Sequence, residues 1–146
     1  TLMNILKLRF LLLFTVLSLV FSACKKDKDT EPTNTDLVVA HEWKGDKVLV
    51  NGIDVSARPE IKSMLLDIKS TTLTLRRDGS YTAVYNQNGT TQTTTGTWTF
   101  KENETIIYFD LLGDLQIIAL TGSTMQLFKT VTQDNTTFDA EVHFVK

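Results

Sequence analysis

The sequence predicts an all-β domain: eight short antiparallel strands that follow one another along the chain and close into a barrel, with one short helix between strands 1 and 2. Three observations predict it. Apolar and polar residues alternate along short segments from residue 73 onward, turn-forming pairs such as Asn51-Gly52 and Asp78-Gly79 separate the segments, and one stretch alone has helical apolar spacing. Such a meander avoids exposed sheet edges by closing into a barrel.

The chain begins with a segment of different composition. Lys7 and Arg9 are the only charged residues before Cys24, and a mostly apolar run extends from Phe10 to Ala23. A basic start followed by a short apolar run is typical of an export signal. The run is shorter than the ~20 residues of a membrane-spanning helix. We therefore expect residues 1–23 to be a signal peptide, with an uncleaved membrane helix as the alternative.

The single cysteine follows this run. Phe21-Ser22-Ala23-Cys24 resembles the lipobox of bacterial lipoproteins, in which small residues precede a cysteine that receives diacylglycerol before the chain is cut on its amino side. The resemblance implies that Cys24 is a lipidation site and the membrane anchor. Stable anchoring needs two or more acyl chains, because a single chain holds a protein only weakly. Without a second cysteine, the chain forms no internal disulfide.

Residues 24–35 are predicted to be the lipidated cysteine and a flexible tether. Their charges cancel, no apolar residue follows the cysteine, and Pro32 disfavours regular structure. Cys-Lys-Lys-Asp at positions 24–27 also resembles the signal that sends lipoproteins of some Gram-negative groups to the cell surface; a plain solvated spacer is the alternative. We expect an outer-membrane lipoprotein, and leave open whether it faces the periplasm or the cell surface.

The remaining residues, 36–146, suffice for one domain with its own core. Their 10 Lys and Arg against 14 Asp and Glu give a net charge of −4. No basic stripe is present, and nucleic-acid phosphates require clustered Lys and Arg. We therefore expect no nucleic-acid partner.

The first strand of this domain is predicted over Trp43–Val50, closed by the turn Asn51-Gly52, whose residues tolerate positive φ. A helix follows, with Ser56 as its N-cap and Pro59 in its first turn. Its apolar stripe has the spacing i, i+3, i+4 and i+7. We expect it to cover the sheet or a barrel end rather than bind a partner. The stripe consists of Ile61, Met64, Leu65 and Ile68.

After the helix the apolar period changes to two, which is the period of a half-buried strand. Leu73 and Leu75 alternate with polar residues, and Asp78-Gly79 turns the chain into the next strand. The strands predicted from there on are Ser80–Tyr85, Thr93–Phe100, Thr105–Phe109, Leu115–Leu120, Thr124–Thr132 and Phe138–Val145.

Three landmarks carry a family resemblance: Trp43 in the first strand, Asp78-Gly79-Ser80-Tyr81, and Gly96-Thr97-Trp98. Their order and spacing resemble the lipocalin-like domain of many small bacterial surface lipoproteins, over nearly all of residues 36–146. The resemblance implies an up-and-down β-barrel or barrel-like sheet that can hold a small apolar molecule. One position departs from the family pattern, because His41 stands where a glycine is usual.

An eight-stranded barrel either fills its interior with side chains or admits one small ligand. Both alternatives stay open, because bulky residues dominate the inward-facing set. The candidate cavity-lining residues are Trp43, Leu75, Tyr85, Trp98, Leu127 and Phe138.

No pattern predicts catalysis. His41 and His143 are the only histidines, His143 is expected on the outward, exposed face of the last strand, and no Gly-x-Ser-x-Gly elbow is present. No close repeat of His, Cys and carboxylates suggests a metal site. We therefore expect no catalytic residues, metal or cofactor. The predicted function is a lipid-anchored, non-enzymatic envelope lipoprotein that binds a small apolar molecule; the alternative is a protein-interaction module, an accessory subunit or inhibitor, with a packed interior.

Overall fold

The computed structural model describes residues 30–64 and 67–146. The chain divides into two compact units, and the second, Pro32–Lys146, contains every element discussed below. The predicted signal peptide, Cys24 and most of the predicted tether lie outside the described residues. No helix in the described part of the chain is long and apolar enough to cross a membrane.

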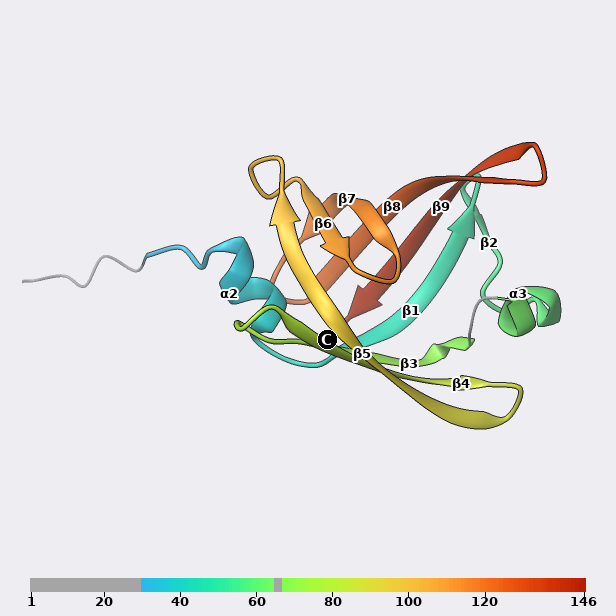
Figure 1. Cartoon of the computed structure of the whole chain (residues 1–146), viewed down its shortest axis with the longest axis horizontal. Coiled ribbons are helices and arrows are strands. Elements are labelled where there is room, and N and C mark those ends of the chain that lie inside the picture. Colours follow the sequence, from blue (N-terminus) through green and yellow to red (C-terminus); the bar gives the residue numbers. More distant parts are fainter. Residues whose placement is uncertain (1–29, 65–66) are drawn as a thin grey trace, which may run out of the picture. The chain divides into compact units, whose positions relative to one another are not determined.

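The unit is an antiparallel barrel, as predicted (Figure 1). From β3 to β9 each strand pairs with the next one in the chain, and β1 pairs with both β3 and β9, which closes the barrel. Eight strands form the wall, while β2 pairs only with the end of β1. The strands are β1 (Trp43–Val50), β2 (Ile53–Asp54), β3 (Asp67–Leu75), β4 (Ser80–Gln87), β5 (Thr90–Lys101), β6 (Ile106–Phe109), β7 (Gly113–Leu120), β8 (Thr124–Gln133) and β9 (Thr136–Val145).

Helix α2 (Asn34–Val39), which precedes β1, was not predicted. Asn34 and Thr35, expected in the tether, form its first turn. The helix begins with a capping box: Asp36 N donates to Thr33 Oγ1 at 3.1 Å, and Thr33 N donates to Asp36 Oδ2 at 2.9 Å. Its apolar residue Val38 is fully buried in the barrel core. The regular structure of the barrel unit therefore includes residues before Asp36, the predicted start of the domain.

Helix α3 (Pro59–Met64) confirms the predicted helix between the first two barrel strands, and Pro59 begins it. The prediction was wrong about Ile68, which lies in β3 as a buried strand residue. Leu65 lies outside the described residues. The helix is therefore shorter than the apolar stripe suggested, since a buried strand residue happened to fall at helical spacing.

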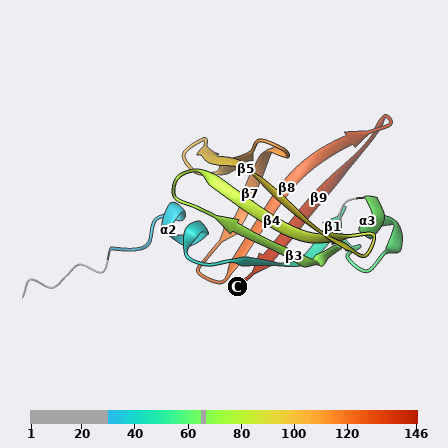
Figure 2. The same ribbon diagram turned by 60° about the horizontal axis from the view of Figure 1, so that its bottom comes forward.

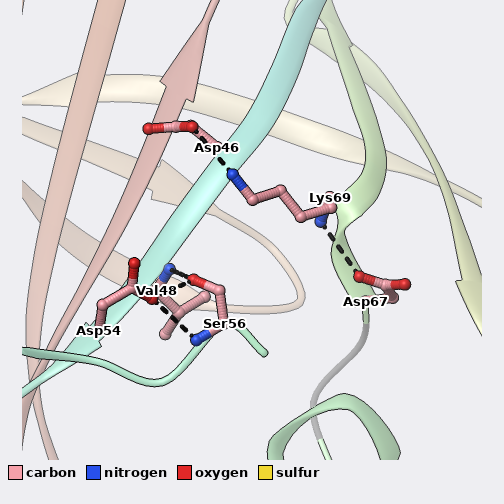
Figure 3. A network of polar contacts seen from close by, with 6 residues as sticks. All are labelled: Asp46, Val48, Asp54, Ser56, Asp67 and Lys69. Atoms are coloured by element: carbon pink, nitrogen blue, oxygen red, sulfur yellow. Dashed lines mark hydrogen bonds and ion pairs between the residues drawn. The ribbon is translucent and has the colours of Figure 1, made fainter. Parts of the chain in front are cut away.

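Ser56 was predicted as a helix N-cap, and this was wrong. Its Oγ accepts a hydrogen bond from Val48 N at 2.8 Å and donates to Asp54 Oδ1 at 2.6 Å (Figure 3). The reason is that β1 leaves β3 after Trp43 and Lys44, the only β1 residues paired with that strand. The serine hydroxyl satisfies a backbone N–H that would otherwise have no partner at this separation.

Two further contacts hold the junction of β1 and β3. Lys69 Nζ on β3 lies 3.2 Å from Asp46 Oδ1 on β1 (Figure 3). Gly45 lies against Ile68 so closely that a Cβ there would overlap the Ile68 carbonyl oxygen. The close approach of the two backbones therefore requires glycine at position 45.

Candidate functional site: the barrel interior

The barrel has two unlike ends. At one end, here called the α2 end, lie α2, the β3–β4 turn (residues 76–79) and the β7–β8 turn (residues 121–123) (Figure 2). At the other, here called the far end, lie the β1–β2, β4–β5 and β8–β9 turns and helix α3, which precedes the start of β3. The far-end turns are tight two-residue connections with positive φ, at 51–52, 88–89 and 134–135.

Large side chains fill the interior at the α2 end. Trp43 is fully buried, and its Nε1 donates to the Val38 carbonyl of α2 at 2.9 Å. Trp98 is 8% exposed, and its Nε1 donates to the Arg76 carbonyl of the β3–β4 turn at 3.0 Å. Both indole N–H groups are thus satisfied by backbone that closes this end. Four of the six residues predicted to line a cavity belong to the buried core: Trp43, Leu75, Trp98 and Leu127.

On β4, β8 and β9, the exposure of the inward-facing residues rises toward the far end, whereas Ile68 near the start of β3 stays buried. On β4, buried Tyr81 is followed on the same face by half-buried Tyr85. On β9, buried Phe144 is preceded on the same face by half-buried Phe138. Tyr85 and Phe138, the other two predicted lining residues, are outside the core cluster. The structure thus divides the six predicted residues into a packed group and a partly solvated group.

Polar groups also reach the inner face of the barrel. Tyr81 Oη donates to Asp110 Oδ1 at 3.2 Å. A Cβ at Gly96, on the face that carries Trp98, would overlap the Asp110 carboxylate, so this glycine makes room for it. Burial, followed by the Asp110 charge, raises the pKa of Tyr81 to about 12. The phenol is therefore a protonated hydrogen-bond donor at neutral pH.

Lys129 is the second charged group on the inner face. It lies on β8 between buried Leu127 and half-buried Val131, with the alternation that places all three on the inward side. Its Nζ donates to the Leu112 carbonyl and lies 3.3 Å from where a Cβ at Gly113 would stand. Within the described residues, no Asp or Glu oxygen lies within 4.0 Å of this Nζ.

Neither charged residue was predicted from the sequence as part of the barrel interior. Lys129 could have been found, since it falls two residues after Leu127 in a predicted strand whose inward face was already assigned. Asp110 could not have been predicted, because it lies in the β6–β7 turn. Only the folded chain brings it close to Gly96 and Tyr81.

The two histidines have different environments. The His41 ring lies 4.3 Å from the Trp43 ring, and its Nε2 is buried without a hydrogen-bond partner among the described residues. Burial, and then the charge of Lys146, lower the pKa of His41. His143 lies on the outward face as predicted, but the expected exposure was wrong: it is 8% exposed, and Nε2 lies 2.9 Å from Glu141 Oε2.

The environments do not resemble a catalytic or metal site. In the described part of the chain, neither ring has a Ser or Thr hydroxyl within hydrogen-bonding distance. A nucleophile beside an oriented base is the arrangement that covalent catalysis requires. The same residues contain no group of three or more His, Cys, Asp or Glu side chains that could hold a metal ion.

The chain matches a known family, described as a lipocalin-like domain, over residues 39–127, which is more than half of its length. The chain belongs to the lipocalin-like domain family. The match includes the three landmarks Trp43, Asp78-Gly79-Ser80-Tyr81 and Gly96-Thr97-Trp98, so the resemblance read from them is confirmed. No curated protein matches the chain.

Solved structures share the fold of this lipocalin-like domain. An odorant-binding protein from bovine nasal mucosa is 13% identical, with a TM-score of 0.52 over 82% of this chain and 77% of that one. The complex of bovine odorant-binding protein with undecanal gives the same values. A complex of that protein with a selenium-containing odorant is 12% identical, with a TM-score of 0.52 over 83% and 76%. At such low identity the similarity establishes the fold alone.

Proposed function

We propose that this protein is a lipid-anchored, non-enzymatic binding protein of the bacterial outer membrane, and that its lipocalin-like barrel takes up a small apolar molecule at the far end. The observation that carries the binding proposal is the gradient of exposure along the inner face. On β4, β8 and β9, inward-facing side chains are packed near α2 and partly solvated near the far-end turns. A ligand that replaces this water would bury apolar surface.

The chemistry of the far-end interior supports an apolar ligand. Its inward-facing residues include half-buried Val50, Tyr85, Val131 and Phe138, which are apolar or aromatic. Small-molecule sites are typically lined by such side chains together with a few polar groups. The bovine relatives in fold, whose structures contain undecanal or another odorant, support the same class of ligand.

Binding is tested by calorimetric titration of the Pro32–Lys146 unit with a small apolar molecule such as decanol. This unit contains every residue of the buried core and every strand pairing of the barrel. We expect saturable binding that Phe138→Ala weakens about tenfold, or about 1.4 kcal/mol. Phe128→Ala is the matched control, because Phe128 is a half-buried aromatic on the outward face of β8. Absence of binding, or equal effects of the two substitutions, would contradict the proposal.

The anchor is tested separately with Cys24→Ser in the complete chain. We expect the variant to lose acyl labelling and to leave the membrane fraction, since a serine hydroxyl cannot form the thioether through which the lipid is held. A variant that remains membrane-bound would show that the apolar run Phe10–Ala23 is retained as the anchor.

The alternative, a protein-interaction module, is supported by one surface feature. Leu111 and Leu112, adjacent in the β6–β7 turn, are 64% and 59% exposed. A photo-crosslinking residue at Leu111 would capture a partner in intact cells if this surface is an interface, whereas one at outward-facing Thr99 would not. A ligand-free barrel together with a crosslink specific to Leu111 would favour this alternative over small-molecule binding.

A further inference from the structure

We propose that the far-end interior selects anionic amphiphiles: the ligand carries a carboxylate that pairs with Lys129 and an apolar chain that lies along the half-buried residues beyond it. This inference rests on the proposed binding function and specifies its ligand class. It is carried by the position, burial and pairing of Lys129 relative to the other charged groups.

The register of β8 places Lys129 inside the barrel. Leu127 pairs with Val142, Lys129 with Ala140, and Val131 with Phe138, without interruption. Because side chains alternate along a strand, Lys129 shares the inner face with buried Leu127. The hydrogen bond from its Nζ to the Leu112 carbonyl directs the ammonium group toward the β6–β7 turn.

Three other lysines have a carboxylate nearby, and Lys129 differs from them in this respect. Lys62, Lys69 and Lys101 lie within 4.0 Å of Asp67, Asp46 and Asp114, respectively. The inward-facing Lys129 has no carboxylate within that distance among the described residues. A charge that is partly removed from water is stabilised by an opposite charge, so its complement is an anionic group of the ligand.

The negative charge on the inner face is already partnered. Asp110 accepts a hydrogen bond from Tyr81 Oη, and its carboxylate lies over Gly96 on β5. Asp110 belongs to the β6–β7 turn, the same turn whose Leu112 carbonyl accepts the hydrogen bond from Lys129. An anionic head group is attracted by Lys129 and repelled by Asp110, so the balance of these two charges determines how strongly it binds.

Packing determines the direction of the ligand. On the α2 side of Lys129 the inward residues, such as Leu127 and Met125, are buried in the core. On the far side, Val131 and its cross-strand partner Phe138 are half-buried. The head group therefore lies at the floor of the solvated region, and the apolar chain extends from it toward the far-end turns.

The experiment compares decanoate with decanol, which share a ten-carbon chain and differ in the charge of the head group. Calorimetric titrations at pH 7 use the Pro32–Lys146 unit and are repeated on the complete chain in phosphatidylcholine nanodiscs, with empty nanodiscs as the blank. We expect decanoate to bind about tenfold more tightly than decanol, the factor expected of one charge-assisted hydrogen bond of about 1.5 kcal/mol.

Substitutions of Lys129 separate the effect of its charge from the effect of its hydrogen bond. Lys129→Gln keeps a donor for the Leu112 carbonyl but removes the charge, so we expect it to weaken decanoate binding about tenfold and to leave decanol binding unchanged. Lys129→Arg should retain the preference for decanoate. Lys44→Gln is the matched control, because it removes one positive charge from an exposed residue of β1. Asp110→Asn should strengthen decanoate binding by removing the repulsion.

The outcomes separate this inference from the function on which it rests. Equal affinity for the two molecules, or an effect of Lys129→Gln no larger than that of Lys44→Gln, overturns the assignment of Lys129 and leaves the binding function intact. Failure of both molecules to bind contradicts the binding function itself.

Discussion

The α2 end and the far end of the barrel are built from the same strands, yet they differ in packing. At the α2 end, two tryptophans fill the interior and donate to carbonyls of α2 and of the β3–β4 turn. At the far end, three tight turns and the segment that contains β2 and α3 connect the strands, and the inward-facing side chains at the far ends of β4, β8 and β9 are partly solvated. The difference teaches that alternation alone makes a wall, while a packed core also needs large side chains that reach the backbone closing the end.

Glycines serve two different purposes in the barrel. Gly45, two residues after Trp43, lets β1 and β3 approach until their backbones touch. Gly96 and Gly113 instead leave room on the inner face for polar atoms, those of Asp110 and Lys129. A missing Cβ therefore tightens packing at the β1–β3 junction and admits charged groups on the inner faces of β5 and β7.

The largest expected effect contrasts the most buried aromatic with a partly solvated one. Trp43→Ala should lower the free energy of unfolding by about 4 kcal/mol, since it removes a fully buried side chain and leaves a cavity. Phe138→Ala should lower it by less than half as much, because water already reaches this side chain. Urea denaturation of both variants measures the difference. Equal losses would mean that the two ends are packed alike.

A smaller effect is expected from one added methyl group. Gly45→Ala should lower the free energy of unfolding by about 2 kcal/mol, because the new Cβ overlaps the backbone oxygen of Ile68. Gly122→Ala, in the β7–β8 turn at the same end, has no neighbouring atom within 4 Å of the new Cβ. Its change should stay within about 0.5 kcal/mol. Comparable losses in thermal unfolding would argue against a tight β1–β3 junction.

The α2 end should also be the acid-sensitive end. Burial lowers the pKa of His41 below 6.5, so the unfolded chain binds its proton at a higher pH than the folded one. Stability should therefore fall as the pH drops from 7 through 6.5 toward the folded-state pKa. His41→Gln should flatten this part of the profile of unfolding free energy against pH. An unchanged profile would show that another group is responsible.

The smallest effect concerns the exposed ion pair that ties α2 to the β3–β4 turn. Arg77 lies 2.7 Å from Asp36, and its hydrogen bond, with those from Thr33, lowers the pKa of Asp36 to about 2. The contribution of this carboxylate to stability is present above pH 4 and is lost as the pH falls toward 2. Arg77→Gln should raise the pKa of Asp36, as measured by NMR titration. A pKa that stays near 2 would assign the shift to Thr33 alone.

Elements defined by local alternation were predictable. The eight wall strands, the helix before β3 and the landmark tryptophans all followed from spacing and turn residues, because a strand with one buried face must alternate. The missed helix α2 also has a local signal, Thr33 followed three residues later by Asp36 and then by apolar residues. Its short length and its place beside a charged, proline-containing stretch obscured that signal.

The errors occurred where a residue depends on distant partners. Ser56 caps no helix because it satisfies a backbone group of β1, which separates from β3 at this point. His143 is buried although it faces outward, because Glu141 and the strands on both sides flank it. Neither environment can be read from neighbouring positions in the chain.

By itself, the sequence determined the all-β barrel, the order of its strands and the family to which the chain belongs, because alternation, turns and landmark tryptophans are local patterns. Only the tertiary structure decided which inward-facing residues are packed and which are solvated. It also brought Asp110 to Tyr81 and, among the described residues, left Lys129 with no carboxylate within 4.0 Å. The physical reason is that burial and charge pairing depend on which strands, turns and helices meet in space.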